Sequence, residues 1–166
     1  MANLAEILMV EHLAIRHSRK ALEISPDMVS LETFNTYLKN CHIEIEEKVL
    51  FPIILESNDI STSIKEEAKR IMADHKLIQA LFGNLSKWYT SQEMEKFGSR
   101  YSLYFKLLQD HNDKEDSNIF PHWDSISGQM LTQAKKEAAS IIDSFGKRQY
   151  LEVTGLTRDS YSYLFR

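Results

Sequence analysis

The sequence is poor in the residues that interrupt helices or cross-link chains. Its 166 residues include five glycines, three prolines and one cysteine, Cys41. A single cysteine cannot form an internal disulfide, which indicates a protein of the reducing cytosol. The N-terminal apolar stretch is interrupted by Glu6, Glu11 and His12, so it does not have the pattern of a signal peptide. We therefore expect a cytoplasmic protein.

The sequence also lacks long runs of one charge and long apolar runs. The formal net charge is −4, with acidic and basic residues interspersed, which argues against a nucleic-acid groove and against binding to an anionic membrane surface. The apolar runs are too short to span a bilayer. We expect neither a nucleic-acid nor a membrane partner, and the length suggests one domain with its own core.

Helical periodicity dominates what is present. Apolar residues recur every three or four positions along four stripes, at residues 4–22, 31–53, 64–89 and 94–115. The last two stripes alternate steps of four and three, as in closely packed helices that run nearly parallel or antiparallel. Together with short connections, this pattern predicts an all-α fold, an up-down-up-down four-helix bundle.

Polar segments and capping patterns mark the expected breaks. SPD at 25–27 separates the first two helices, and SND at 57–59 separates the second from the third. A hydroxyl residue followed three positions later by glutamate predicts a capping box, and two such pairs occur near expected helix starts: Ser63 with Glu66, and Thr90 with Glu93. Pro52 and Pro121 should kink or end their helices.

The C-terminal part of the chain supports one further helix. It is expected over about 128 to 145, with Gly146 as its stop. The residues after it are polar with scattered aromatics and carry no assignable pattern. The predicted organisation is residues 1–146 as the four-helix bundle plus an additional C-terminal helix, and residues 147–166 as a C-terminal tail.

One motif occurs twice. HIEIEEKVLFP at 42–52 and HNDKEDSNIFP at 111–121 both read His, three residues, Glu, four residues, Phe-Pro. In a helix the Glu lies one turn from the His on the same face. Each Phe is expected to close the apolar layer next to this pair, and each Pro to end the helix. The motif therefore places a histidine and a carboxylate together in the interior of two helices.

Each apolar stripe also carries one histidine: His12, His42, His75 and His111. In antiparallel neighbours, residues equally far from the turn lie side by side. His12 and His42 are equidistant from residue 27, and the other two histidines from residue 93. Glu46 lies level with His75 about the SND turn. A buried carboxylate is costly unless it is paired or bound to metal, so this set at one height predicts a metal site inside the bundle.

The types of side chain indicate which metal. Imidazole nitrogens with carboxylate oxygens and no thiolate suit iron, manganese or zinc. Four imidazoles and two carboxylates that can bridge fit two ions better than one. Open positions would remain on each ion for water, an oxo bridge or substrate. Because structural zinc sites are normally closed and four-coordinate, the pattern favours a chemical role for the site.

At these residues the sequence resembles the hemerythrin-like family of iron-binding four-helix bundles. The resemblance covers about residues 4 to 122 and rests on the His12 position, the two Phe-Pro motifs and the DHKLI segment around His75. It implies a non-haem di-iron centre: two iron ions, bridged by Glu46 and Glu115, with room for an oxo or hydroxo bridge. The implied metal ligands are His12, His42, Glu46, His75, His111 and Glu115.

Two departures separate this sequence from the oxygen-carrying members. Those have a fifth histidine where this chain has Gln79, four residues after His75. They also take their last carboxylate five residues after the final histidine, where this chain has Asp116. Glu115 stays on the helical stripe and is the preferred bridge, with Asp116 as the alternative. The pattern is similar to that of four-His, two-Glu members that act in iron–sulfur-cluster repair and nitric oxide response.

Several other residues that could bind metal are expected to lie outside the site. On the surface or beyond the bundle we expect His17, Glu44, Glu47 and His122. Cys41, Tyr101 and Tyr104 are expected to be packing residues, although a tyrosine close to the ions could hydrogen-bond a bound ligand or pass an electron.

Three functions are compatible with the pattern. The leading one is a cytosolic di-iron protein that binds or reduces a small ligand, such as dioxygen, nitric oxide or peroxide. Oxidase, reductase or peroxidase-type turnover would need an electron donor, such as a partner protein. The second is a sensor of oxygen, nitric oxide or iron, or an iron-delivery module for iron–sulfur-cluster repair, without turnover. The third is a buried polar network, which rarely needs six matched groups.

Overall fold

The computed structural model describes residues 2–166, and every regular element among them is helical. The all-α prediction is confirmed. Three long helices are α1 (Leu4–Ile24), α5 (Thr62–Thr90) and α6 (Met94–Asn118). A fourth rod is composite and consists of α2 (Met28–Tyr37), η1 (Leu38–His42), α3 (Ile43–Ile45), η2 (Glu46–Leu50) and α4 (Phe51–Glu56). No helix in residues 2–166 has the length and apolarity needed to cross a membrane.

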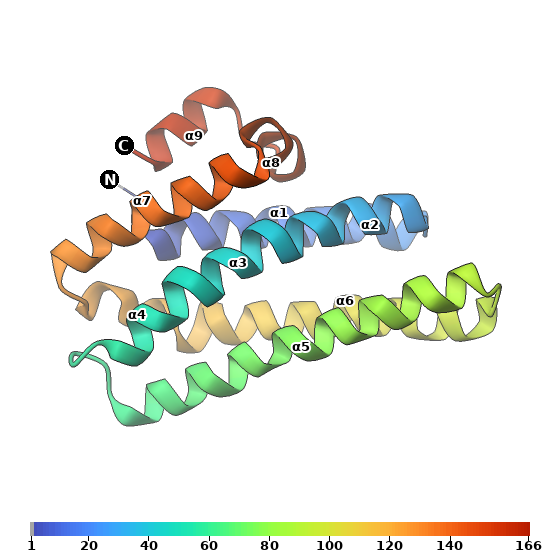
Figure 1. Ribbon diagram of the computed structural model, residues 1–166, viewed down its shortest axis with the longest axis horizontal. Coiled ribbons are helices and arrows are strands. Elements are labelled where there is room, and N and C mark those ends of the chain that lie inside the picture. Colours follow the sequence, from blue (N-terminus) through green and yellow to red (C-terminus); the bar gives the residue numbers. More distant parts are fainter. Residues whose placement is uncertain (1) are drawn as a thin grey trace.

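These four rods form a helical bundle (Figure 1). The chain turns back at the short connections after α1, α4 and α5, so that α5 packs along α6 and α4 packs against α5. α1 packs against α6, which joins the first rod to the last. Side chains from all four rods therefore face one interior.

The observed helix starts differ from the predicted capping boxes. Ser63 and Thr90 are not N-caps, because α5 already begins at Thr62 and Thr90 is its last residue. The Thr90 hydroxyl donates to the carbonyl of Ser86. A hydroxyl residue followed by glutamate also fits a helix interior, where Glu66 pairs with Lys69. A true capping box opens α1, where the Asn3 side chain accepts from Glu6 N–H and the Glu6 carboxylate accepts from Asn3 N–H.

Only the second of the two Phe-Pro sequences ends an α-helix. α6 ends before Pro121, which lies in the first turn of the 3-10 helix η3 (Phe120–Ser125), as predicted. Pro52 does not end its helix, because α4 continues to Glu56. It follows the π-helical segment η2, where Phe51 N–H donates to the Glu46 carbonyl five residues back. The wider turn accommodates the ring, which in a regular α-helix clashes with the carbonyl of the preceding turn.

The C-terminal segment, residues 128–166, covers one side of the bundle. α7 (Gly128–Phe145) matches the predicted fifth helix, and Gly146, with φ +118°, ends it. Residues 147–166, the predicted tail whose sequence carries no assignable pattern, contain α8 (Lys147–Thr154) and α9 (Arg158–Leu164). α8 packs on α1 and α2. The positive φ at Gly146 permits the reversal that directs the chain back onto the bundle.

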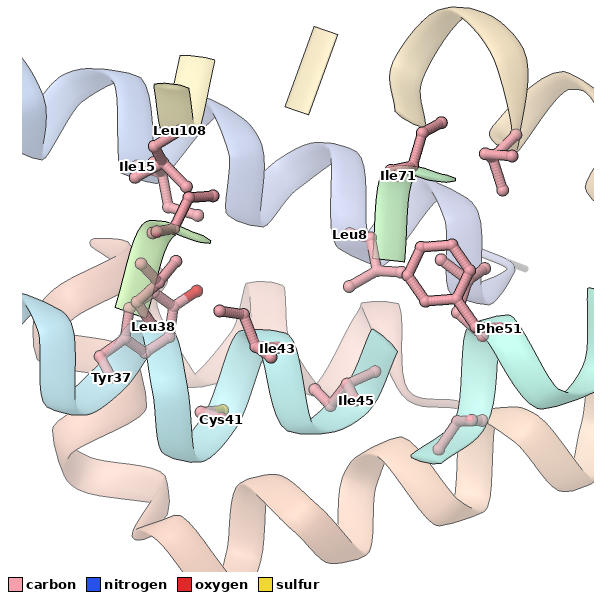
Figure 2. Packing of buried hydrophobic residues seen from close by; sticks show 14 of the residues in the cluster. Leu8, Ile15, Tyr37, Leu38, Cys41, Ile43, Ile45, Phe51, Ile71 and Leu108 are labelled. Carbon is pink, nitrogen blue, oxygen red and sulfur yellow. The ribbon is translucent and has the colours of Figure 1, made fainter. Parts of the chain in front are cut away.

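Apolar side chains form layers inside the bundle. Figure 2 shows Leu8, Phe51 and Ile71, from three different rods, gathered in one layer. The phenylalanines of the two motifs adjoin the histidines: Phe120 stacks on His12 with ring centroids 5.3 Å apart, and Phe51 meets His75 edge-on at 5.9 Å. These layers exclude water from the region next to the histidines.

This packing predicts a large loss of stability for Phe120→Ala. Phe120 is 3% exposed, and removing a buried phenylalanine side chain costs about 3–5 kcal/mol. Leu13→Ala is the matched control, because Leu13 is 62% exposed and its truncation should change the unfolding free energy by about 0.5 kcal/mol or less. Urea unfolding measures both. Equal effects of the two substitutions would contradict the assigned packing.

Candidate metal centre

Six buried side chains from all four rods converge inside the bundle. α1 contributes His12, the composite rod His42 and Glu46, α5 His75, and α6 His111 and Glu115. They form two groups, each with its candidate ligand atoms within 4.8 Å of one another: His12 and His42 with both glutamates, and His75 and His111 with the same glutamates. The structure thus brings together all the ligands that the sequence and the resemblance indicated.

The distances show how the two carboxylates lie between the histidine pairs. Glu46 Oε1 lies 2.9 Å from His42 Nε2, and Glu46 Oε2 lies 3.1 Å from His75 Nε2. The Glu115 carboxylate faces both pairs through Oε2, which is 3.3 Å from His12 Nε2 and 3.5 Å from His111 Nε2. Each carboxylate therefore lies within reach of two separate positions.

Most of these inward-facing atoms have no hydrogen-bond partner. The unpartnered atoms at the cluster are His12 Nε2, His42 Nε2, and both carboxylate oxygens of Glu46 and of Glu115. Buried charges without a partner are strongly destabilising, and a bound cation would satisfy all of these atoms at once. The donor set of nitrogen and oxygen without sulfur suits iron, manganese or zinc. The residues present therefore fit a metal centre.

An outer set of carboxylates faces the imidazoles, and its members beside His12, His42 and His75 lie within hydrogen-bond distance. Each histidine has Nδ1 toward a carboxylate that lies outside the cluster: His12 toward Asp116 at 2.8 Å, His42 toward Glu11 at 2.7 Å, His75 toward Glu47 at 3.0 Å, and His111 toward Asp74 at 3.8 Å. An Nδ1–H directed outward leaves the Nε2 lone pair directed inward, which is the arrangement of a metal-binding histidine.

The sequence did not assign this outer set. Glu47 was expected on a solvated face, yet it contacts His75 while remaining 44% exposed. Glu11 lies on an apolar stripe and was given no role. Adjacency in the sequence could have identified two members of the set, because Asp74 and Glu47 are each next to a predicted ligand. Asp116, the alternative bridge, lies outside the cluster against His12 and Arg16.

The remaining candidates lie away from the cluster. His17 is exposed, and His122 is half-buried in η3. Cys41 is buried, which raises the pKa of its thiol. The Tyr101 hydroxyl donates to the carbonyl of Leu22. These groups therefore have local packing or surface environments, as expected.

Gln79, where the resemblance places the fifth histidine of the oxygen carriers, is held by another side chain. Asn35 Nδ2 donates to Gln79 Oε1, and Gln79 Nε2 donates to Asn35 Oδ1, both at 3.2 Å. The Tyr104 hydroxyl donates to the same Asn35 oxygen at 2.9 Å. Both ends of the Gln79 amide are therefore occupied by Asn35.

Neighbouring carboxylates make two of the buried histidines, His42 and His111, basic. Burial lowers the pKa of His42, but the charge of Glu46 and the hydrogen bond to Glu11 outweigh it and raise the pKa to about 9. Burial also opposes protonation of His111, yet Glu115 and Asp74 raise its pKa to about 10. Burial raises the pKa of Glu46, but the surrounding imidazoles hold it well below the usual range. Protons thus balance the carboxylate charge in the metal-free protein.

In the metal-free protein, the unfolding free energy should fall as the pH rises from about 6.5 to about 10. The folded-state pKa values of His42 and His111 are raised from 6.5 to about 9 and about 10. Below the unfolded-state pKa, the two histidines contribute fully to the unfolding free energy. This contribution is lost as the pH rises through the folded-state pKa, at a rate of at most about 1.4 kcal/mol per pH unit for each histidine.

Urea unfolding of chelator-treated protein across this pH range measures the effect. His17→Gln is the control, because that histidine is exposed and its loss should leave the slope unchanged. Stability that stays constant or rises with pH would contradict the predicted charge of the cluster.

Comparison with known proteins agrees with this geometry. Residues 3–123 match the family model Hemerythrin, described as the hemerythrin HHE cation binding domain. No curated protein and no solved structure matches the chain. The matched region contains all six converging residues and ends before α7. With most of its length matched and a buried histidine–carboxylate cluster at its centre, the chain belongs to the hemerythrin family of cation-binding domains.

Proposed function

We propose that the six converging side chains hold two iron ions as a non-haem di-iron centre. The supporting observation is that the two four-residue groups share Glu46 and Glu115, while each has its own pair of histidines. Glu46 presents a different oxygen to each group. In this arrangement the two glutamates would be shared by both ions, and each of the four rods, in the up-down-up-down order predicted from the sequence, would contribute one histidine.

We further propose that the centre binds or reduces a small ligand such as dioxygen, nitric oxide or peroxide. When bound, the iron pair would supply ligand-binding positions and up to two electrons. The chain supplies the surroundings: Phe51 and Phe120 exclude water beside the histidines. Residue 79 is a glutamine whose amide pairs with Asn35. The position therefore offers no imidazole, which favours ligand reaction over reversible carriage. Turnover would draw on an electron-donor protein.

A second candidate is a sensor or an iron-delivery module for cluster repair, without turnover. The observation that favours it is the exposure of the carboxylates outside His75 and His111: the side chains of Glu47 and Asp74 are 44% and 29% exposed. This side of the centre is the more accessible to an exchanging ion. Steady-state turnover with a chemical reductant supports the first candidate, and iron transfer to an acceptor without turnover supports the second.

The di-iron proposal predicts two iron atoms per chain and their joint loss. Glu46→Ala and Glu115→Ala should each release both ions, because each carboxylate faces both positions. Asp116→Ala should retain the pair with weaker binding, since Asp116 contacts His12 Nδ1 from outside, and loss of such an outer partner typically costs about 10- to 100-fold in affinity. Metal analysis with Mössbauer spectroscopy on anaerobically purified protein measures this.

Two results would reject this assignment. Saturation of the unaltered protein at one ion per chain would exclude a pair. A full pair in Glu115→Ala, together with its loss in Asp116→Ala, would make Asp116 the bridge. Glu44→Ala is the control, because the Glu44 side chain is paired with Lys48 on the outside of the rod and its loss should leave the iron content unchanged.

The identity of residue 79 predicts how the reduced protein responds to dioxygen. The unaltered protein should be oxidised in a reaction that is not reversed when dioxygen is removed. Gln79→His should recover part of the reduced absorption spectrum on removal of dioxygen, because it restores the carrier-type residue. Gln79→Leu is the control, since it also breaks the pairing with Asn35 without adding an imidazole. Full reversibility in the unaltered protein would instead indicate a carrier.

A further inference from the structure

A hydrogen-bond chain links the candidate centre to the C-terminal helices. The Tyr150 hydroxyl donates to Glu11 Oε1 at 2.7 Å, and Glu11 Oε2 lies 2.7 Å from His42 Nδ1. All three side chains are buried. Tyr150 belongs to α8, which lies outside residues 3–123 that match the family. A residue beyond the matched domain therefore contacts the support of one candidate ligand.

Glu11 differs from the other three outer carboxylates. Asp116, Asp74 and Glu47 are 23%, 29% and 44% exposed at the side chain, whereas Glu11 is 0% exposed. Asp116 and Asp74 also contact Arg16 and Lys114. Among residues 2–166, no lysine or arginine forms an ion pair with Glu11. Asp116 and Asp74 each have a cation beside them, whereas the hydrogen-bond partners of Glu11 are His42 and Tyr150.

The Tyr150 ring is held independently of its hydroxyl. Its centroid lies 6.2 Å from that of Tyr37 and 5.9 Å from that of Tyr161. Tyr37 in turn stacks over the His42 imidazole, with centroids 6.5 Å apart and an interplanar angle of 28°. Removing only the Tyr150 hydroxyl therefore leaves the aromatic packing in place and tests the hydrogen bond alone.

We propose that Tyr150 is a positioning residue for His42 and that α8 thereby supports one of the two metal positions. Without the Tyr150 hydroxyl, the buried Glu11 Oε1 would lose its hydrogen-bond donor, which is costly. The carboxylate would no longer be fixed with Oε2 toward His42 Nδ1. The imidazole would then lose the contact that directs its Nε2 toward the cluster. The inference rests on the proposed two-ion centre and concerns only the position beside His12 and His42.

The test is stepwise binding of ferrous iron to the Tyr150→Phe protein under anaerobic conditions, in competition with a chromophoric chelator. One of the two binding steps should weaken about 10-fold or more, the size typical for loss of an outer partner of a metal-binding histidine. The other step should change less than about 2-fold, because the partners of His75 and His111 are untouched. Mössbauer spectra of the loaded protein should show one altered iron signal and one unaltered signal.

Two controls separate positioning from general loosening. Tyr161→Phe removes a hydroxyl from a ring that packs on Tyr150 and should leave both steps unchanged. Glu11→Leu should weaken the same step as Tyr150→Phe. Adding Tyr150→Phe to Glu11→Leu should then have no further effect, because the hydroxyl acts through Glu11.

Nitrogen NMR of the His42 ring in metal-free protein gives a readout independent of iron stoichiometry. Tyr150→Phe should change the His42 Nδ1 signal, and Tyr161→Phe should not. An unchanged signal, or equal weakening of both binding steps, would overturn the role of Tyr150. If the unaltered protein binds fewer than two ions while the His42 signal still responds to Tyr150→Phe, the two-ion proposal fails and the positioning of His42 by Tyr150 stands.

Discussion

The structure depends on the burial of two carboxylates at the centre of a helical bundle. Glu46 and Glu115 are fully buried, and neither has a hydrogen-bond partner. Four imidazoles surround them, and a further carboxylate lies outside each imidazole. Charge thus alternates outward from the centre, from carboxylate to imidazole to carboxylate. In an interior without water, each charge needs an opposite charge beside it, because an uncompensated charge there is far more costly than at the surface.

The sequence predicted the inner layer of this arrangement because helix geometry relates the ligands to one another. His42 and Glu46 are one turn apart, and the distances of His12 and His42 from their connecting turn are equal. The helical period therefore predicts on which face of its helix each side chain lies and at which level along the bundle. The apolar stripes likewise predict which face of each rod is buried in the core, so the four rods could also be predicted.

The outer layer could not be predicted in the same way. Tyr150 meets Glu11 across 139 positions of the chain, and no local repeat relates them. α8 and α9 have eight and seven residues, too few for a clear periodic signal. The capping patterns at Ser63 and Thr90 failed for a related reason, since the same short pattern is compatible with a helix interior. Whether Glu47 contacts His75 is decided by side-chain conformation rather than by spacing.

The two π-helical segments of the composite rod set its rotational phase. His42 ends η1 and Glu46 begins η2, so both candidate ligands lie within π turns. Each residue of an α-helix turns the chain by about 100°. In a regular α-helix, removing one residue between His42 and Leu50 would therefore rotate Pro52 and everything after it by roughly a quarter turn relative to His42, whereas the wider turn of η2 can absorb such a change by reverting to α-helix. The composite rod can therefore accept a single-residue deletion at this point while the face that follows the motif stays toward the bundle interior.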